Sequence, residues 1–377
     1  MSVVYKKLED VCEILDSRRV PITAKDRKAG AFPYYGANGL QDYVADYIFD
    51  DELVLLAEDG GNFGSKERPI AYRVSGKCWV NNHAHVLKAK PNMHVDYLCY
   101  ALMFYDTEGL VNGATRQKLT QAAMRQMVIP YRDMTEQLQI IEKISQIVRA
   151  IEKRKEELQL LDQLVKSRFI ELFGDPVRNS MGLPTEPMTT VCAIIDGDRG
   201  KNYPKQDDFS DTGYCLFLNA KNVTATGFSF ENRMFITKEK DNALHNGKLE
   251  RGDVVLTTRG TLGNLAFYDD SVPFENVRIN SGMVILRMNK SVMTEVFFME
   301  QFKLQLQSIK GKIASGSAQP QLPISTMNKI RILLAPMALQ EQFAAFVEQT
   351  DKSKLAVQKG LQELEILKKS LMQQYFG

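Results

Sequence analysis

The chain has 377 residues, 44% of them hydrophobic and 25% charged, and a formal net charge of +2. This composition indicates a globular protein of roughly two or three domains, and the near-neutral charge means that any basic surface must be local. The opening MSVVYKKLED has no apolar signal-peptide core and no apolar run reaches membrane-spanning length. We therefore expect a cytoplasmic location unless a partner carries the chain elsewhere.

The first predicted domain covers residues 1–130 and is rich in β-strands. Aromatic and β-branched clusters alternate with glycine-containing turns at Gly36, Gly39 and Gly60, a pattern typical of strands and loops. The stretch AYRVSGKCWVNNHAHVLKAK (71–90) predicts two strands joined by a turn at Gly76-Lys77. The next segment, 94–105, has apolar residues at helical spacing and predicts a helix that packs on the sheet.

A long helix is predicted over residues 131–174. Either Asp133 or Thr135 can cap its start, and Gly174 followed by Asp175-Pro176 ends it. At ~1.5 Å per residue the helix exceeds ~50 Å. Spacings of four and three residues give it a coiled-coil seam, which consists of Ile140, Ile144, Ile147, Ile151, Arg154, Leu158, Leu161, Val165, Arg168 and Leu172.

The same plan is repeated in the second half of the chain. A proline-rich linker over 175–187 leads to a second β-rich domain, 188–336, in which 294–309 predicts a helix, and a second long helix covers 337–377. Residues 155–174 align without a gap with 358–377, Val11-Cys12 reappears as Val191-Cys192, and Leu119 and Met124 align with Leu322 and Met327. Farther upstream, Glu136-Gln137 aligns with Glu341-Gln342 once a two-residue offset is allowed.

These observations predict an α+β fold with two β-rich domains separated by an antiparallel pair of long coiled-coil helices. Each helix must bury one apolar stripe, and the other helix is the simplest partner. The alternative is that both are ordinary core helices of separate domains. The second helix carries Thr350, Lys354 and Lys368 where the first has Ile147, Ile151 and Val165, so one end of the pair is expected to be looser and open to a partner.

Catalytic and metal-binding patterns are not found in the sequence. The five cysteines have no CxxC spacing and are expected to be reduced and mostly buried. His83 and His85 share a strand face and His94 follows, but nothing at regular spacing completes a metal site. The glycine-rich stretches 60–64 and 259–264 match no nucleotide-binding motif, so we interpret them as tight loops near a binding surface.

Polar side chains gather on glycine-flanked loops in both copies. Asn, Gln, Arg and Lys are the residues that hydrogen-bond base edges and phosphates. Any one of these residues can be an ordinary solvated turn residue, so the interpretation depends on their clustering. The candidate DNA-binding residues are Tyr35, Asn38, Asn81, Asn82, His83, Arg116, Gln117 and Lys118 in the first copy, and Asn219, Lys221, Asn222, Arg259, Thr261, Asn264, Arg278, Asn280, Gln319 and Gln321 in the second.

Several motifs, together with the duplicated plan, resemble the specificity subunit of type I restriction-modification systems. The motifs are PYYGANG, LLAEDGGNFG, GKCWVNNHAHVLKA, GDVVLTTRGTLGN and the two QxL…EQ…long-helix endings. The resemblance covers essentially the whole chain and implies two target-recognition domains, each followed by a helical spacer. It also implies a non-catalytic DNA reader that directs adenine-N6 methylation and restriction to an asymmetric bipartite site, one half per domain.

The resemblance further implies partners that perform the chemistry. Two methylation subunits, and in the full complex two restriction subunits, would bind the chain and double-stranded DNA. The chain itself would need no cofactor, because S-adenosylmethionine, ATP and Mg would be bound by partner subunits. It contains no [DN]PP[YF] methyltransferase motif and no helicase P-loop. The alternatives are a stand-alone DNA endonuclease, which the lack of a metal-carboxylate cluster opposes, and a protein-protein scaffold without DNA selectivity.

Overall fold

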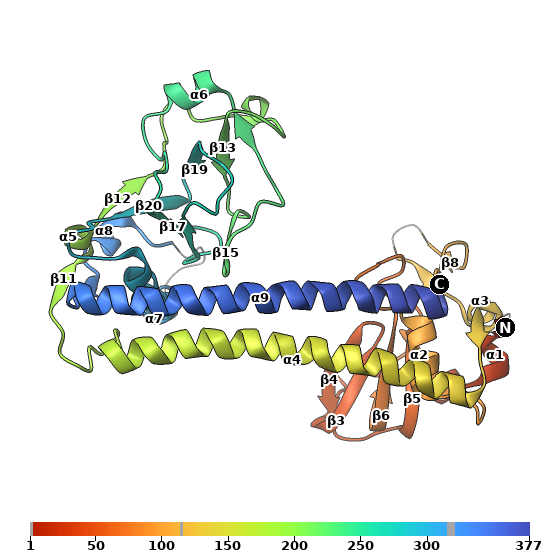
Figure 1. The fold of residues 1–377 in the computed structure, drawn as a ribbon. Helices are drawn as coiled ribbons and strands as arrows, with labels where there is room; N and C mark the ends of the chain where they lie inside the picture. Colours follow the sequence, from red (N-terminus) through yellow and green to blue (C-terminus); the bar gives the residue numbers. More distant parts are fainter. Residues whose placement is uncertain (1–2, 114–115, 315–320) are drawn as a thin grey trace. The chain divides into compact units, whose positions relative to one another are not determined.

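The computed structural model describes residues 3–113, 116–314 and 321–377, which form two compact units (Figure 1). Unit 1 comprises Met1–Glu156 and Gln358–Gly377, and unit 2 comprises Glu157–Val357. These units divide each long helix between them, so the domain boundaries expected at residues 130, 187 and 336 stay predictions. Within the described residues, no helix combines the length and the apolar character that a membrane crossing requires.

Two helices of 40 residues each, α4 (Met134–Phe173) and α9 (Met337–Phe376), are the longest elements. Asp133 caps α4, since its carboxylate accepts a hydrogen bond from the backbone N–H of Glu136 at 2.9 Å. Gly174 follows α4 with a φ of 75°, a left-handed conformation that glycine adopts without strain. α4 begins in unit 1 and ends in unit 2, and α9 does the reverse.

Within each unit, the two helix ends pack against each other in antiparallel order. In unit 1, Met372 near the end of α9 shares a buried cluster with Ile140 and Ile144 near the start of α4. In unit 2, Phe169 near the end of α4 stacks edge-on against Phe343 near the start of α9, with ring centroids 5.5 Å apart. The predicted antiparallel helix pair is therefore confirmed.

Unit 2 accommodates two of the polar residues that interrupt the second seam. Thr350 is buried and donates a hydrogen bond to the carbonyl of Phe346 in its own helix at 2.9 Å. Lys354 lies 2.8 Å from the carboxylate of Asp162 on α4. Lys368, in unit 1, is half-buried.

Unit 1 contains a six-stranded sheet of order β2-β7-β5-β6-β3-β4, in which β3 and β6 are parallel and the other neighbours antiparallel. Its strands are β2 (Cys12–Ile14), β3 (Ala29–Gly36), β4 (Gly39–Val44), β5 (Phe49–Ala57), β6 (Ala71–Val80) and β7 (Ala84–Ala89). The other elements of the unit are β1 (Val4–Lys7), α1 (Leu8–Val11), the 3-10 helix η1 (Asp16–Arg18), α2 (Val95–Met103), β8 (Val111–Asn112), β9 (Lys118–Leu119), α3 (Gln121–Gln126) and β10 (Val128–Tyr131).

The expected turn at Gly76-Lys77 is wrong. β6 runs through Gly76, whose φ is 73°, and stays paired with β5 on both sides of it. β5 pairs with β6 from Ala71 to Cys78, and glycine takes up the local twist without breaking the ladder. The chain reverses instead at 81–83, where the side chain of Asn81 accepts a hydrogen bond from the backbone N–H of His83 at 2.8 Å.

The sheet of unit 1 is buried on both faces, because successive side chains of a strand point to opposite sides. Val54 and Leu56 on β5 belong to a cluster with α2 and the ends of the long helices. Leu53 and Leu55 belong to a smaller cluster on the other face. The first face therefore joins the sheet to the helix pair, as Figure 1 shows for α2 and α4.

Unit 2 contains a four-stranded sheet, β12-β20-β17-β18, and a three-stranded sheet, β16-β13-β19. The strands are β11 (Thr185–Pro187), β12 (Cys192–Asp196), β13 (Cys215–Leu218), β14 (Val223–Thr224), β15 (Gly227–Phe228), β16 (Phe235–Ile236), β17 (Asp253–Thr257), β18 (Leu265–Tyr268), β19 (Val277–Ile279), β20 (Met283–Met288) and β21 (Arg331–Leu333). The helices are α5 (Met188–Val191), the 3-10 helix η2 (Gln206–Asp208), α6 (Lys238–Ala243), α7 (Glu295–Ala314) and α8 (Ile324–Met327).

Two of the cores of unit 2 meet across β17 in the same alternating way. Val254 and Leu256 pack with α7 and with the ends of α4 and α9. Val255 points to a second cluster that covers the three-stranded sheet. Each unit thus uses a central strand, β5 or β17, to connect a helix-facing core to a second core.

The structure corrects one part of the repeat alignment. Gln137 receives a hydrogen bond from the backbone N–H of His94 before α2, and Gln340 receives one from Thr294 before α7, both at 2.8 Å. Gln137 is therefore equivalent to Gln340 and not to Gln342. No two-residue offset is needed, because both glutamines lie in the first turn of their helices, which begin at Met134 and Met337.

All five cysteines are buried and free, as the sequence predicted. Burial raises the pKa of the Cys12 and Cys192 thiols to about 12. These side chains therefore act as small apolar core residues and not as reactive thiolates.

Candidate nucleic-acid interface

Four segments of unit 1 meet where the strands β3, β5 and β6 end and β7 begins, and we call them loop cluster 1: 37–38, 58–60, 81–83 and 116–119. The side chain of Asn38 donates to the carbonyl of Gly60 at 2.9 Å. The backbone N–H of Gly60 donates to the carbonyl of Gln117 at 3.2 Å. The backbone N–H of Asn81 donates to the carbonyl of Tyr35, at the end of β3, at 3.0 Å. The candidate residues of the first copy are thus brought together.

Arg116, the most exposed cation of loop cluster 1, forms an ion pair with Asp59, an acid that sequence reasoning missed. Arg116 has 58% of its side chain exposed, and one of its guanidinium nitrogens lies 2.5 Å from Asp59. His83 Nδ1 lies 2.7 Å from the same carboxylate oxygen. The EDGG sequence (58–61) contained the only local signal, because an acid in a candidate DNA-binding loop repels phosphates unless a cation neutralises it.

The candidate residues of unit 1 differ in accessibility. Asn81 is buried and structural, since it also donates to the Gln41 side chain at 3.1 Å. Tyr35 is half-buried, and burial raises the pKa of its hydroxyl, which keeps it a neutral hydrogen-bonding group. His83 is half-buried as well. The exposed members are Asn38, Asn82, Arg116, Gln117 and Lys118.

Unit 2 has a corresponding set, loop cluster 2: 219–223, 258–264, 280–282 and 321–322. The backbone N–H of Thr258 donates to Gly282 O at 2.8 Å, and that of Leu322 donates to Thr258 O at 3.1 Å. The side chain of Asn264 donates to Val223 O at 2.9 Å. Hydrogen bonds therefore connect segments that are far apart in sequence into one surface.

Arg259 is an exposed cation of loop cluster 2. It is exposed, and it makes no hydrogen bond or ion pair through its side chain with the residues that the structure describes. Lys310, on α7, was missed from the sequence. A Cβ placed on Gly263 would lie 2.3 Å from Lys310 Cε, so the lysine stem lies against this glycine. Gly263 thus makes room for a second cation beside the loop.

Other candidates in unit 2 have structural partners. Arg278 is buried, where it binds the Asp241 carboxylate and donates to the carbonyls of Asn246 and Leu244, so its guanidinium is not available to DNA in this conformation. Asn222 is fully buried and donates to two backbone carbonyls. Asn219, Asn264 and Asn280 are half-buried, and Lys221, Thr261 and Gln321 are exposed. Gln319 lies outside the described residues.

The two loop clusters occupy equivalent places in their units. Leu56 on β5 is paired with His85, and Leu256 on β17 is paired with Val284. Each strand then leads to a glycine with a left-handed φ, 64° at Gly60 and 70° at Gly260. The side chains differ at this common position, where Asp59 of unit 1 precedes Gly60 and Arg259 of unit 2 precedes Gly260.

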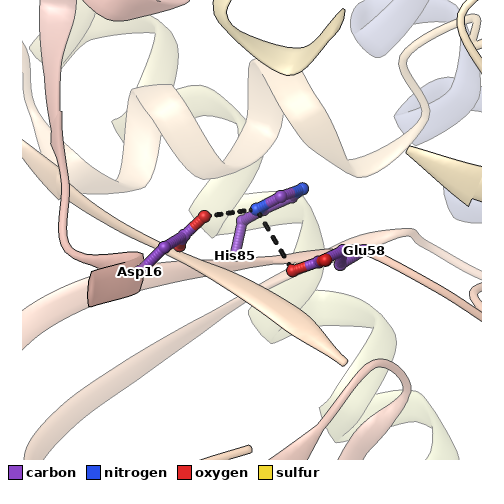
Figure 2. A group of neighbouring side chains, drawn as sticks. All are labelled: Asp16, Glu58 and His85. Atoms are coloured by element: carbon purple, nitrogen blue, oxygen red, sulfur yellow. Dashed lines mark hydrogen bonds and ion pairs between the residues drawn. The ribbon is translucent and has the colours of Figure 1, made fainter. Parts of the chain in front are cut away.

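Glu58 of loop cluster 1 lies close to Asp16 and His85, and the three side chains are near enough to one another to hold a metal ion (Figure 2). His85 Nδ1 is 2.6 Å from Asp16 and 3.6 Å from Glu58. Two cations already bind these carboxylates, however: Arg19 at 2.6 Å and Lys118 at 3.1 Å from Glu58. A metal ion there would face a guanidinium and an ammonium, so this group fits an ion-pair network and not a metal site.

The network also determines the charge of Asp16. Burial alone raises the pKa of this carboxyl, but the hydrogen bond and charge of His85, the backbone N–H of Val86 and the Gln121 side chain outweigh burial. The pKa of Asp16 is therefore held below its ordinary value, and the group is ionised at neutral pH.

In a comparison with known protein families, one family matches the chain twice, once in each half. The sequence model of the family described as the type I restriction modification DNA specificity domain matches residues 2–161 and again residues 189–366. The chain belongs to this family. Each matched segment of the specificity chain contains one complete loop cluster, so the family's repeated domain corresponds to the repeated loop arrangement.

Individual relatives span nearly the whole specificity chain. It is 24% identical to the putative type I restriction enzyme specificity subunit S.HindORF215P of Haemophilus influenzae, covering 95% of this chain and 90% of that one. It is 22% identical to the type I restriction enzyme MjaVIII specificity subunit of Methanocaldococcus jannaschii, covering 97% and 90%.

Solved structures support the fold. The type I restriction-modification S subunit from M. genitalium matches with a TM-score of 0.59 at 14% identity, covering 100% of this chain and 96% of that one. A chain of a type I R-M system matches with a TM-score of 0.58 at 15% identity, covering 100% and 99%. At these identities the likeness concerns the fold alone.

Proposed function

We propose that the chain is the non-catalytic subunit that gives a type I restriction-modification complex its DNA sequence choice. Unit 1 reads one half of an asymmetric bipartite site through loop cluster 1, and unit 2 reads the other half through loop cluster 2. The observation that supports this most is the equivalence of the two clusters combined with their different side chains, Asp59 with Arg116 in one and Arg259 in the other. Equivalent positions with different chemistry suit two different base sequences.

The partner subunits supply the chemistry in this proposal. Methylation subunits bind S-adenosylmethionine and modify adenine N6, and restriction subunits use ATP and Mg. A non-catalytic chain is supported by the Asp16–Glu58–His85 group, the only potential metal-binding cluster found in the described residues, because Arg19 and Lys118 occupy its carboxylates. The complex would work in the cytoplasm, where bacterial and archaeal DNA is found.

The proposal includes two methylation subunits, one per repeat. Leu164 on α4 and Leu367 on α9 are equivalent in the gapless alignment, and both are exposed large apolar residues, at 48% and 46%. Exposed leucines on a helix suit a partner helix. Leu164→Asp and Leu367→Asp are each expected to remove one methylation subunit, which native mass spectrometry of the complex measures. A wild-type complex that saturates with one copy would contradict the proposed symmetry.

The decisive experiment is competition binding by the complex of this chain with its methylation partners. A duplex that carries the methylated sequence, identified by mapping N6-methyladenine in cells, should be preferred over duplexes with one base pair changed in either half. The chain alone should bind weakly, since its net charge is +2 and the partners contribute phosphate contacts. Cleavage of DNA by the chain alone with Mg²⁺ would favour an endonuclease, and a complex without any sequence preference would favour a scaffold.

A further inference from the structure

The Asp16–Glu58–His85 cluster contacts the segment that carries Arg116 and Lys118. His85 Nε2 lies 2.9 Å from the carbonyl oxygen of Leu119. Glu58 binds Lys118 through its carboxylate at 3.1 Å and accepts a hydrogen bond from Leu119 N–H through its backbone carbonyl at 2.7 Å. We call residues 116–119 the recognition segment. The cluster therefore holds this segment at two adjacent residues, Lys118 and Leu119.

Two further residues, Gln121 and Arg19, also bind the Asp16–Glu58–His85 cluster. Gln121 donates to Asp16 at 3.0 Å. Arg19 binds Glu58 at 2.6 Å and donates to the carbonyl of Ala84 at 2.8 Å. The His85 side chain is fully buried and Asp16 has 4% of its side chain exposed, so little water competes for these bonds. Hydrogen bonds between buried charged groups are strong and direction-specific, which makes the cluster a rigid support.

Unit 2 supports its equivalent segment without this network. Val284 takes the strand position of His85, and Thr258 takes the place of Glu58, since Leu322 N–H donates to Thr258 O as Leu119 N–H donates to Glu58 O. Val284 belongs to the apolar core of unit 2. Thr258 bonds a backbone carbonyl, that of Gly282, at 3.0 Å. The ionic support is therefore a property of unit 1 and is not needed to build the fold.

We propose that His85 is a positioning residue for DNA recognition: together with Glu58 and Asp16 it sets the placement of Arg116 and Lys118, and it does so for one half-site only. The inference rests on the proposed function of loop cluster 1. His85 is buried and does not touch DNA; it acts through the carbonyl of Leu119, and Glu58 acts through the ammonium of Lys118.

The test uses the complex with methylation partners and three variants: His85→Val, the double variant Glu58→Thr/His85→Val, and Val54→Ala as a control in the core of the same sheet. The double variant copies the pair found in unit 2, and it also removes the carboxylate that binds Arg19 and Lys118. Two quantities are measured for each: the melting temperature, and the affinity ratio between the cognate duplex and duplexes with one base pair changed in each half-site.

His85→Val should reduce discrimination in the half-site of unit 1 about tenfold, the loss expected for one good base contact, and leave the other half unchanged. The double variant should lose at least as much discrimination, because Lys118 then lacks the Glu58 carboxylate and the Leu119 carbonyl still lacks His85. Val54→Ala should lower the melting temperature and keep discrimination. If discrimination follows melting temperature across all three variants, or if His85→Val keeps full discrimination, the positioning role is overturned. A wild-type complex without selectivity would overturn the proposed function and this inference with it.

Discussion

Gln137 and Gln340 make the same three hydrogen bonds in the two units. Gln137 accepts from the backbone N–H of His94 and donates to the carbonyls of Asn92 and Arg132, at 2.8, 3.1 and 2.8 Å. Gln340 accepts from Thr294 and donates to Val292 and Ala335, at 2.8, 3.0 and 2.8 Å. Both carboxamides are fully buried. Each glutamine thus joins the start of a long helix to the start of the helix that covers a sheet.

Replacing either glutamine with methionine keeps its volume and removes all three bonds. Gln137→Met and Gln340→Met should each destabilise their own unit by about 2–4 kcal/mol, because buried backbone groups lose their partners. Amide hydrogen exchange should show faster exchange in the first turn of α2 for the first variant and of α7 for the second. Gln146→Met, at an exposed position that bonds Glu142 in the same helix, is the control and should change neither. If either variant destabilised both units equally, the hydrogen bonds of that glutamine would not stabilise its own unit alone.

Replacing Arg259 tests whether its side chain contacts a base or a phosphate. Arg259→Ala should relax discrimination in the second half-site by about 1–3 kcal/mol if the guanidinium contacts a base edge, as its exposure and lack of a described partner favour. Competition binding with substituted duplexes at several salt concentrations measures this. A uniform loss on all sequences with a smaller salt slope would instead assign Arg259 to a phosphate. Arg178→Ala, at an exposed arginine outside loop cluster 2, is the matched control.

The buried pair of Asp241 and Arg278 predicts a pH dependence of unit 2. Burial alone would raise the pKa of Asp241, but hydrogen bonds and charges from Lys248 and Arg278 outweigh it, so the folded-state pKa is lowered. A lowered folded-state pKa means stability that is fully present above the unfolded value of ~4 and is lost as pH falls through the folded value.

Asp241→Asn should therefore lower the melting temperature at pH 7, and the cost of leaving Arg278 buried without its counter-charge is about 3–5 kcal/mol. The difference from wild type should begin to shrink below pH ~4, where the unfolded carboxyl takes up a proton, and shrink further as pH falls through the lowered folded-state pKa. Thermal unfolding of the chain from pH 3 to 8 measures both. Asp211→Asn, at an exposed position, should follow wild type throughout. A difference that stays constant across this range would show that the ionised carboxylate is not the source of stability.

The helix pair predicts how the unread gap between half-sites is set. α4 continues without interruption from unit 1 into unit 2, and Arg154 on α4 faces Gly360 on α9, where a Cβ would lie 3.9 Å from the arginine Nε. Inserting four residues after both Lys153 and Lys359 lengthens each helix by ~6 Å, close to one turn, so the apolar seam is approximately kept.

The gap should then widen by about two base pairs, at ~3.4 Å per base pair, while both half-site sequences stay the same. Mapping N6-methyladenine in cells that carry the variant and its partners measures the gap. Insertion in α4 alone is the control and should reduce methylation, because the paired helices no longer match in length. An unchanged gap with normal methylation would show that the helices do not set the spacing.

Sequence periodicity predicted the long helices closely because their pattern extends over 40 residues, from Met134 to Phe173 and from Met337 to Phe376. It misplaced the turn at Gly76, since a glycine signals a special φ without saying whether the chain reverses there. The offset of Gln342 was wrong for a similar reason: a repeated Glu-Gln pair is a weak local signal, and three-dimensional hydrogen bonds identify Gln340 instead.

The site was predicted as a set of segments but not as a set of available side chains. Arg116 and Arg259 lie where the sequence suggested, yet Arg116 is held by Asp59, 57 residues away, and Arg278 is buried against Asp241, 37 residues away. Whether a cation is free depends on such distant partners, which local patterns do not reveal. The same holds for the Asp16–Glu58–His85 cluster, whose members come from three separate segments of the chain (Figure 2).

The central claim is that each unit reads its own half-site, and exchanging one unit tests it most directly. Residues 1–130 would be replaced by the equivalent segment of a relative that keeps apolar residues facing Ile140, Ile144 and Met372, so that the core with the long helices is preserved. The reciprocal exchange of residues 188–336 is the matched control. Mapping N6-methyladenine in cells should show a new sequence in one half of the site, the original sequence in the other, and the opposite half changed in the control. Changes in both halves from a single exchange, with full methylation retained, would contradict the modular account.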